Sequence, residues 1–234
     1  ALMEVKQKPQ ASHLFNRGDH EQPKQLVEPG ELQHRVKNNL QMITALIRLE
    51  ARNLRGNPAK EPFDRLAGRV ESLALLYRSM SESPADDSID LGTYLSQIAS
   101  SVMQAHAVEG IRLDLKVDAW PVSINVAMPT GLVVNELLTN SLKHAFLAGE
   151  GGTITLHSLV TETGCRVTIA DDGAGLPEGV QWPVPGKMTA LIVQSLKQNA
   201  GASLSITSAP GAGMQATITF TRANAAPEHA DTAE

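Results

Sequence analysis

The sequence predicts an α+β protein in which a helical hairpin precedes an α/β sandwich, and two observations predict it. Over about residues 28 to 81, apolar residues recur three and four positions apart, as they do on the buried face of an amphipathic helix. From about residue 111 on, segments that alternate apolar and polar residues are interleaved with further helical segments. A sheet with helices packed on one face is the usual outcome of such a mixture.

The first helix is expected from about residue 28 to 55. Acidic residues flank Pro29 and Gly30 at its start, and the run from Gly56 to Pro58 ends it. On a helical projection, His34 and Asn38 lie together on the face opposite an apolar stripe, so His34 is predicted to face solvent. The stripe consists of Leu32, Val36, Leu40, Ile43, Ile47 and Leu54.

The second helix is expected from about residue 61 to 81. Its apolar residues repeat at spacings of four and three and are Leu66, Val70, Leu73, Tyr77 and Met80. Two such helices joined by a short turn form an antiparallel hairpin. Because a single hairpin buries its stripe poorly, whereas two hairpins form a four-helix bundle, a homodimer is predicted. The alternative is that both stripes pack on the second domain of the same chain.

The remaining chain predicts one further domain. A short polar segment with a proline, residues 83–88, is expected to act as the hinge between the two. The predicted division is a flexible arm over 1–27, the hairpin over 28–88, the second domain over 89–221 and a disordered tail over 222–234. Within the second domain we expect helices over 90–106, 126–146 and 188–199, and strands over 111–117, 122–124, 153–160, 165–170, 202–207 and 214–220.

Composition excludes several classes of protein. The net charge of −5 argues against a general nucleic-acid surface. A single cysteine, Cys165, excludes an internal disulfide framework and suits a reducing, cytoplasmic compartment. The sequence contains no apolar run long enough to span a membrane and no expected signal peptide.

Three polar patches in the second domain are candidate binding elements. In the run from Asn135 to His144, Glu136 and Asn140 lie four residues apart on one helix face, and Lys143 and His144 extend that face. Carboxylate and amide oxygens with a lysine can hold a hydrated Mg²⁺ and phosphate groups. Read alone, the patch also fits the polar outer face of an ordinary helix.

The second patch, from Asp171 to Gly175, follows a strand, where glycines let the backbone approach a flat ligand and a carboxylate can accept a hydrogen bond from an adenine amine. It also fits a common Asp/Gly turn. The third patch, from Gly186 to Leu191, precedes a helix whose N-terminus can take phosphate.

Taken together and in order, these motifs resemble the transmitter region of sensor histidine kinases. The resemblance covers about residues 30 to 221. The run from His34 to Gln41 is similar to the dimerisation and phosphoacceptor box, the run from Asn135 to His144 to the N box, and the run from Asp171 to Gly175 to the first glycine box. The resemblance implies that the second domain has the Bergerat ATP-binding fold shared with gyrase and the Hsp90 chaperone.

The resemblance also implies roles for residues of the hairpin and the N box. His34 would take the γ-phosphoryl group of ATP and pass it to an aspartate of a response-regulator receiver. Asn38 matches the position that orients water when a partner is dephosphorylated. Glu136 matches the base of the wider ATPase fold. Asn140, assisted by Asn135, would ligate Mg²⁺.

The rest of the pocket follows from the same resemblance. Lys143 and His144 would contact phosphates, and Asp171 would accept a hydrogen bond from the adenine amine, with Gly173 and Gly175 shaping that pocket.

One departure from the family pattern keeps a second function open. Thr189 stands where the family usually has a glycine close to the phosphates, and the loop from Leu176 to Met188 is short and contains three prolines. The kinase reading therefore has an alternative, an ATP-independent histidine phosphotransferase or receiver phosphatase with a degenerate ATP-binding domain.

Overall fold

The computed structural model describes residues 29–54, 56–82, 88–106, 109–146 and 151–222. Of residues 29–35, 37, 81, 82 and 199 it describes the backbone only. The predicted arm over 1–27, nearly all of the predicted hinge and the tail from residue 223 on therefore lie outside the described residues.

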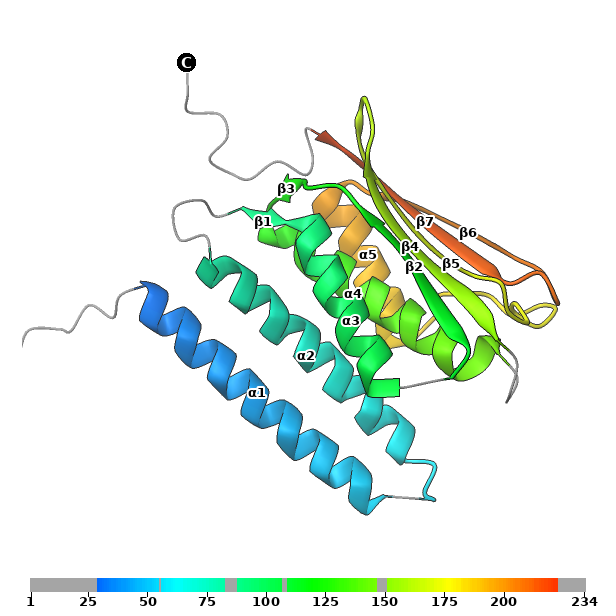
Figure 1. Ribbon diagram of the computed structural model, residues 1–234, viewed down its shortest axis with the longest axis horizontal. Coiled ribbons are helices and arrows are strands. Elements are labelled where there is room, and N and C mark those ends of the chain that lie inside the picture. The colour runs from blue at the N-terminus through cyan, green and yellow to red at the C-terminus, as the bar shows by residue number, and fades with distance from the viewer. Residues whose placement is uncertain (1–28, 55, 83–87, 107–108, 147–150, 223–234) are drawn as a thin grey trace, which may run out of the picture.

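The first two helices form the predicted hairpin. Helix α1 spans Pro29–Asn53 and α2 spans Lys60–Glu82, and they run antiparallel with a tight turn between them. On its other side, α2 lies against the helices of the second domain (Figure 1). One contact across that junction is a hydrogen bond that the Tyr94 hydroxyl donates to the carbonyl oxygen of Ser72, at 3.1 Å.

The second domain is a five-stranded sheet with helices on one face (Figure 1). The strand order is β2-β4-β5-β7-β6, in which only the β2–β4 pair is parallel. The strands are β2 Ile111–Val117, β4 Gly152–Val160, β5 Gly164–Asp171, β6 Ser203–Ser208 and β7 Met214–Thr221. The helices are α3 Leu91–His106, α4 Ile124–Asn140 and α5 Met188–Ala200, and a π-helical turn, Ser141–Ala145, continues α4. A short separate ladder pairs β1 Ile89–Asp90 with β3 Pro121–Val122.

The core lies between the helices and the inner sheet face, and it is mainly aliphatic. Alternate strand residues such as Ile154 and Leu156 are fully buried, as the period of two predicts. Leu95 of α3, Leu138 of α4 and Leu196 of α5 meet them from the helical layer and are equally buried. The α+β class and the sandwich are thus confirmed.

Three details differ from the sequence expectation. Ile43, assigned to the buried stripe, is 42% exposed, because α2 covers only a narrow seam of α1 around Thr44 and Ala51. The long helix expected over 126–146 is α-helical only to Asn140 and then widens into the π turn. The two-residue strand β1 was not expected, because it is too short to show a period.

Candidate functional site

A cleft of about 530 Å³ lies between the end of α4 and the turn that follows β5. Four residues predicted to belong to the site line it: Asn140, His144, Asp171 and Gly175. The loop after that turn supplies another wall, with Trp182 among the lining residues. We call this space the nucleotide cleft.

Asp171 is fixed in position at the end of β5. Its Oδ2 accepts a hydrogen bond from the Ser141 hydroxyl at 2.7 Å, and its Oδ1 accepts one from the Gly173 N–H at 3.1 Å. A carboxylate held by two donors keeps its orientation while its remaining lone pairs stay available to a ligand amine. Sequence analysis did not single out Ser141, although it directly follows Asn140 in the same polar patch.

The two predicted glycines allow the backbone to pack closely around the cleft. A Cβ on Gly173 would overlap the carbonyl oxygen of Ala145. Gly175 has φ +69°, and a Cβ there would overlap the carbonyl oxygen of Ala209. The N–H of Ala174, between them, donates to the Ala145 oxygen at 2.7 Å. Gly173 therefore lets the β5 turn dock against the end of the π turn, and Gly175 lets it approach the connection between β6 and β7.

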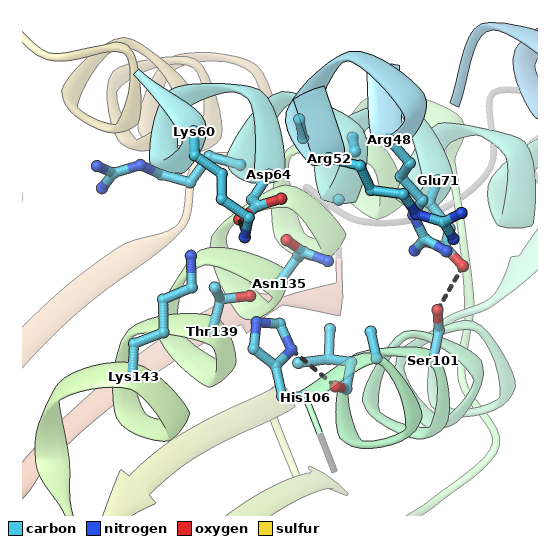
Figure 2. A pocket seen from close by; sticks show the side chains of 16 residues that line it. Arg48, Arg52, Lys60, Asp64, Glu71, Ser101, His106, Asn135, Thr139 and Lys143 are labelled. Carbon is cyan, nitrogen blue, oxygen red and sulfur yellow. Dashed lines mark hydrogen bonds and ion pairs between the residues drawn. The ribbon is translucent and has the colours of Figure 1, made fainter. Parts of the chain in front are cut away.

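The polar residues of α4 divide between two faces. Glu136 and Asn140 face the cleft side, as their spacing predicts. Asn135, Thr139 and Lys143 instead line a separate cavity of about 460 Å³, bounded by the hairpin, α3 and α4 (Figure 2). We call it the junction cavity. The structure therefore does not bring Asn135 or Lys143 into the nucleotide cleft.

Glu136 is paired with the hairpin. Its side chain is only 3% exposed, and its Oε1 accepts a hydrogen bond at 2.7 Å from Nε of Arg69 on α2. Oε2 accepts from the Thr189 hydroxyl at 3.4 Å, and Nη1 of Arg69 also lies 2.9 Å from the Met188 sulfur. Sequence reasoning missed Arg69, because no spacing within α2 indicates a partner 67 residues away.

Thr189 occupies the position where a glycine was expected. It lies in the first turn of α5, is buried, and lines a space of about 360 Å³ together with Glu136 and Asn140. Asn140 and Trp182 line both this space and the nucleotide cleft. The hydroxyl of Thr189 thus hydrogen-bonds the carboxylate beside the cleft.

His34 lies far along the hairpin from the cleft. Its backbone belongs to α1, and its imidazole lies outside the described residues. Arg48 of α1 pairs with Glu71 of α2, which fixes the register of the two helices. Because the two helices are antiparallel, His34 lies fourteen residues from this pair in one direction, and Arg65, which lines the cleft, lies six residues from it in the other. At 1.5 Å per residue, His34 and Arg65 are therefore about 30 Å apart along the hairpin.

Asn38, one turn after His34, is exposed.

The cleft can bind a nucleotide by ordinary chemistry. Asp171 offers an acceptor at one end, and cationic or titratable groups from Arg65 and His144 lie among the other lining residues. The amide oxygen of Asn140 is a suitable Mg²⁺ ligand, and Mg²⁺ commonly takes one or two protein ligands, completing its shell with phosphates and water.

Comparisons with known proteins agree with this geometry. Residues 31–106 match the model of a family described as histidine kinase, and residues 125–224 match that of the histidine kinase-, DNA gyrase B- and HSP90-like ATPases. The second domain is thus of the ATP-binding type. No helix among the described residues combines the length and apolar character that a bilayer span requires.

Two curated relatives are sensor kinases by name. Blue-light-activated histidine kinase 2 of Erythrobacter litoralis is 40% identical over 182 residues, which is 76% of this chain and 52% of the relative. Sensor histidine kinase PdtaS of Mycobacterium tuberculosis is 31% identical over 168 residues, 71% of this chain and 33% of the relative. The chain therefore spans between about a third and a half of these relatives.

A solved structure is similar over almost the whole of its own length. The histidine kinase domain of the Erythrobacter litoralis blue-light activated histidine kinase is 38% identical, with a TM-score of 0.65, and the match covers 82% of this chain and 90% of that domain. The chain belongs to the histidine kinase family of two-component signalling.

Proposed function

We propose that this chain is a protein-histidine kinase that phosphorylates His34 from Mg-ATP and passes the phosphoryl group to an aspartate of a response-regulator receiver. The observation that carries the proposal is the nucleotide cleft, in which Asp171 is held by two donors while Asn140 lines the same space. A chain that combines this cleft with a histidine on a helical hairpin has both partners of the transfer.

Different cleft residues bind different parts of the nucleotide. Asp171 accepts a hydrogen bond from the adenine amine, in a pocket shaped by Gly173 and Gly175. Asn140 ligates Mg²⁺, which neutralises charge on the phosphates. His144, which also lines the cleft, would contact the phosphates. Asn135 and Lys143 face the junction cavity and have no part in this step.

The transfer itself needs an unprotonated imidazole, the form in which an ordinary histidine is a nucleophile. A bond forms between a ring nitrogen and the γ-phosphorus, the bond from that phosphorus to the β–γ bridging oxygen breaks, and ADP leaves. The attacking nitrogen is the one that carries no proton, so the proton that the phosphorylated ring gives up comes from the other ring nitrogen. That proton goes to a base, for which Glu136 is the candidate once it is separated from Arg69. The second transfer moves the phosphoryl group from the imidazole to the receiver carboxylate.

The hairpin also supports a homodimer. Along α1, four large apolar side chains that α2 leaves uncovered are between 42% and 59% exposed. They are Met42, Ile43, Leu46 and Leu49. A second copy of the hairpin would cover this face in a four-helix bundle. Sedimentation should give a dimer that Leu46→Glu dissociates, whereas Leu159→Glu, at an exposed leucine of the sheet, should leave it intact.

Incubation with γ-labelled ATP and Mg²⁺ tests the kinase. We expect acid-labile, base-stable label that is lost in His34→Ala and retained in the control His157→Gln, which removes an imidazole on the sheet. Label retained in His34→Ala would mean that a residue other than His34 is the phosphoacceptor. Absence of label together with absence of nucleotide binding by calorimetry would contradict the kinase and favour the ATP-independent alternative that the Thr189 departure suggests.

A further inference from the structure

The junction cavity carries an excess of positive charge. Five cationic side chains line it against two carboxylates, Asp64 and Glu71. The cationic side chains are those of Arg48, Arg52, Lys60, Arg65 and Lys143.

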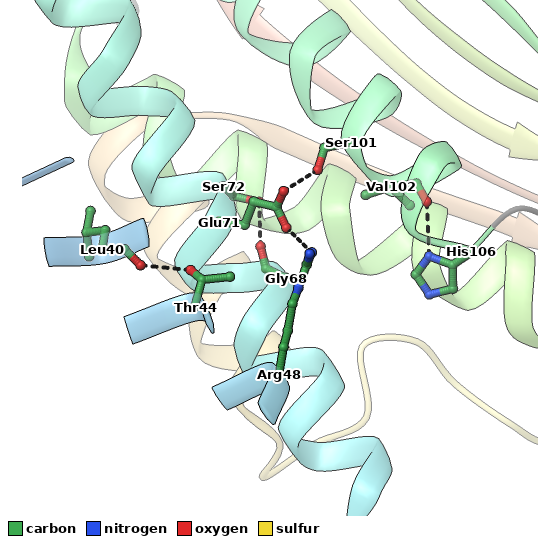
Figure 3. A network of polar contacts seen from close by, with 9 residues as sticks. All are labelled: Leu40, Thr44, Arg48, Gly68, Glu71, Ser72, Ser101, Val102 and His106. Carbon is green, nitrogen blue, oxygen red and sulfur yellow. Dashed lines mark hydrogen bonds and ion pairs between the residues drawn. The ribbon is translucent and has the colours of Figure 1, made fainter. Parts of the chain in front are cut away.

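Three of these cations already have partners. Arg48 pairs with Glu71, whose other oxygen accepts from the Ser101 hydroxyl at 2.6 Å (Figure 3). Lys60 lies 2.7 Å from Asp64, and Arg65 pairs with Glu61 outside the cavity.

Two cations in the cavity are left without a counter-charge. Within the described part of the chain, neither Arg52 nor Lys143 lies within ion-pair distance of a carboxylate. Arg52 belongs to the last turn of α1, and Lys143 to the π turn after α4. The two charges therefore approach the cavity from opposite domains, as Figure 2 shows.

Two buried polar side chains in the same wall also lack partners. Asn135 is 7% exposed and Thr139 is 8% exposed, and both line the cavity (Figure 2). Among the described residues, neither the amide of Asn135 nor the hydroxyl of Thr139 makes a hydrogen bond. Both polar groups open onto the cavity, so both are free to donate hydrogen bonds to a ligand there.

We propose that the junction cavity binds a small phosphate-bearing anion with a di- or triphosphate group. Such a group carries enough charge to neutralise both Arg52 and Lys143, and its oxygens can accept hydrogen bonds from Asn135 and Thr139 at the same time. The volume of about 460 Å³ lies within the range of small-molecule sites. A single carboxylate would neutralise only one of the two cations.

This site opens on a neighbouring face of α4 from the nucleotide cleft, and Arg65 lines both spaces. Because Arg52 belongs to the hairpin and Lys143 to the ATP-binding domain, a bound anion ties the two together. On α4, each residue of the junction cavity directly precedes a residue of the cleft side: Asn135 precedes Glu136, and Thr139 precedes Asn140. The inference does not rest on the kinase activity and is tested without it.

Calorimetric titration of the full chain with inorganic tripolyphosphate, without Mg²⁺, tests the site. We expect one ion bound per chain. Arg52→Gln should weaken binding about tenfold, which corresponds to one charge-assisted hydrogen bond. The matched control Arg166→Gln removes the same charge from the exposed face of the sheet and should leave the affinity within twofold.

Two further variants separate ligand binding from folding and from the cleft. Thr139→Val keeps the side-chain shape and removes an unpaired hydroxyl, so it should weaken binding severalfold without lowering the melting temperature. Asn140→Asp adds a negative charge in the nucleotide cleft and should leave tripolyphosphate binding unchanged.

Three results would overturn the proposal. They are the absence of binding heat, equal weakening by Arg52→Gln and Arg166→Gln, and weakening by Asn140→Asp as large as that by Arg52→Gln, which would place the ion in the cleft. A failure of the kinase test alone would leave this site standing.

Discussion

Replacing Arg69 with alanine should destabilise the ATP-binding domain strongly. The change leaves the Glu136 carboxylate, at 3% exposure, with only the Thr189 hydroxyl at 3.4 Å as a hydrogen-bond partner. Removing one member of a buried ion pair costs about 3 to 5 kcal/mol. Because Arg69 is itself 16% exposed, we expect about 3 kcal/mol, at the lower end of that range.

Urea unfolding followed by tryptophan fluorescence measures this loss, because both tryptophans lie in the ATP-binding domain. With a slope of about 2 kcal/mol per molar urea, Arg69→Ala should lower the midpoint by about 1.5 M. The matched control is Arg65→Ala, one turn earlier on α2. Its partner Glu61 is 45% exposed, so the loss should stay below about 1 kcal/mol.

A second variant separates the ion pair from the packing of the arginine stem. Arg69→Met combined with Glu136→Gln removes both charges and should be more stable than Arg69→Ala, because no buried carboxylate is left unpaired. Equal losses of unfolding free energy in Arg69→Ala and Arg65→Ala would refute the reasoning. They would mean that the ion pair of Glu136 stabilises the fold no more than the ion pair of an exposed carboxylate does.

Three further predictions concern the cleft and the core. Gly175→Ala should cost well over 2 kcal/mol of unfolding free energy, because its Cβ would overlap the carbonyl oxygen of Ala209, whereas Gly179→Ala, at a similar φ of +78° but in open space, should cost only about 1 kcal/mol in the same urea assay. Burial raises the pKa of Tyr94, so the native phenol stays protonated above pH 10 while the unfolded one ionises. Stability should therefore fall with rising pH from about pH 10, and Tyr94→Phe should flatten that fall by about 1.4 kcal/mol per pH unit; an unchanged slope would contradict the assignment. Asn140→Asp should abolish labelling of the chain by γ-labelled ATP while its circular dichroism stays unchanged, and retained labelling would remove Asn140 from the Mg²⁺ site.

Strict periodicity made the regular elements predictable. The strand expected over 111–117 is β2 with the same ends, and the helix expected over 188–199 differs from α5 by one residue. Both have clear turn or cap residues at their boundaries. The buried stripe of α1 was predicted less well. A helical projection gives the apolar face of a helix but not the width of that face that a neighbouring helix covers, and Ile43 lies outside the covered part.

The site was predictable only where its residues are local in the sequence. The spacing of Glu136 and Asn140 gave their common face, and the glycines after Asp171 marked a close approach of the backbone. The π turn escaped prediction because it depends on packing against the β5 turn, a contact between distant segments. Arg69 escaped for the same reason, since an arginine on an amphipathic helix gives no sign of which carboxylate it meets.

With about 30 Å along the hairpin between His34 and the cleft, the observed arrangement keeps the two apart within one chain. If His34 takes the phosphoryl group from the cleft of its own chain, the ATP-binding domain has to leave the end of α2, and the Arg69–Glu136 contact opposes that departure. Any input that weakens the contact by about 1.4 kcal/mol multiplies the departed population tenfold, as long as that population is small. In the proposed kinase, that one ion pair would set how readily the cleft reaches the hairpin of its own chain.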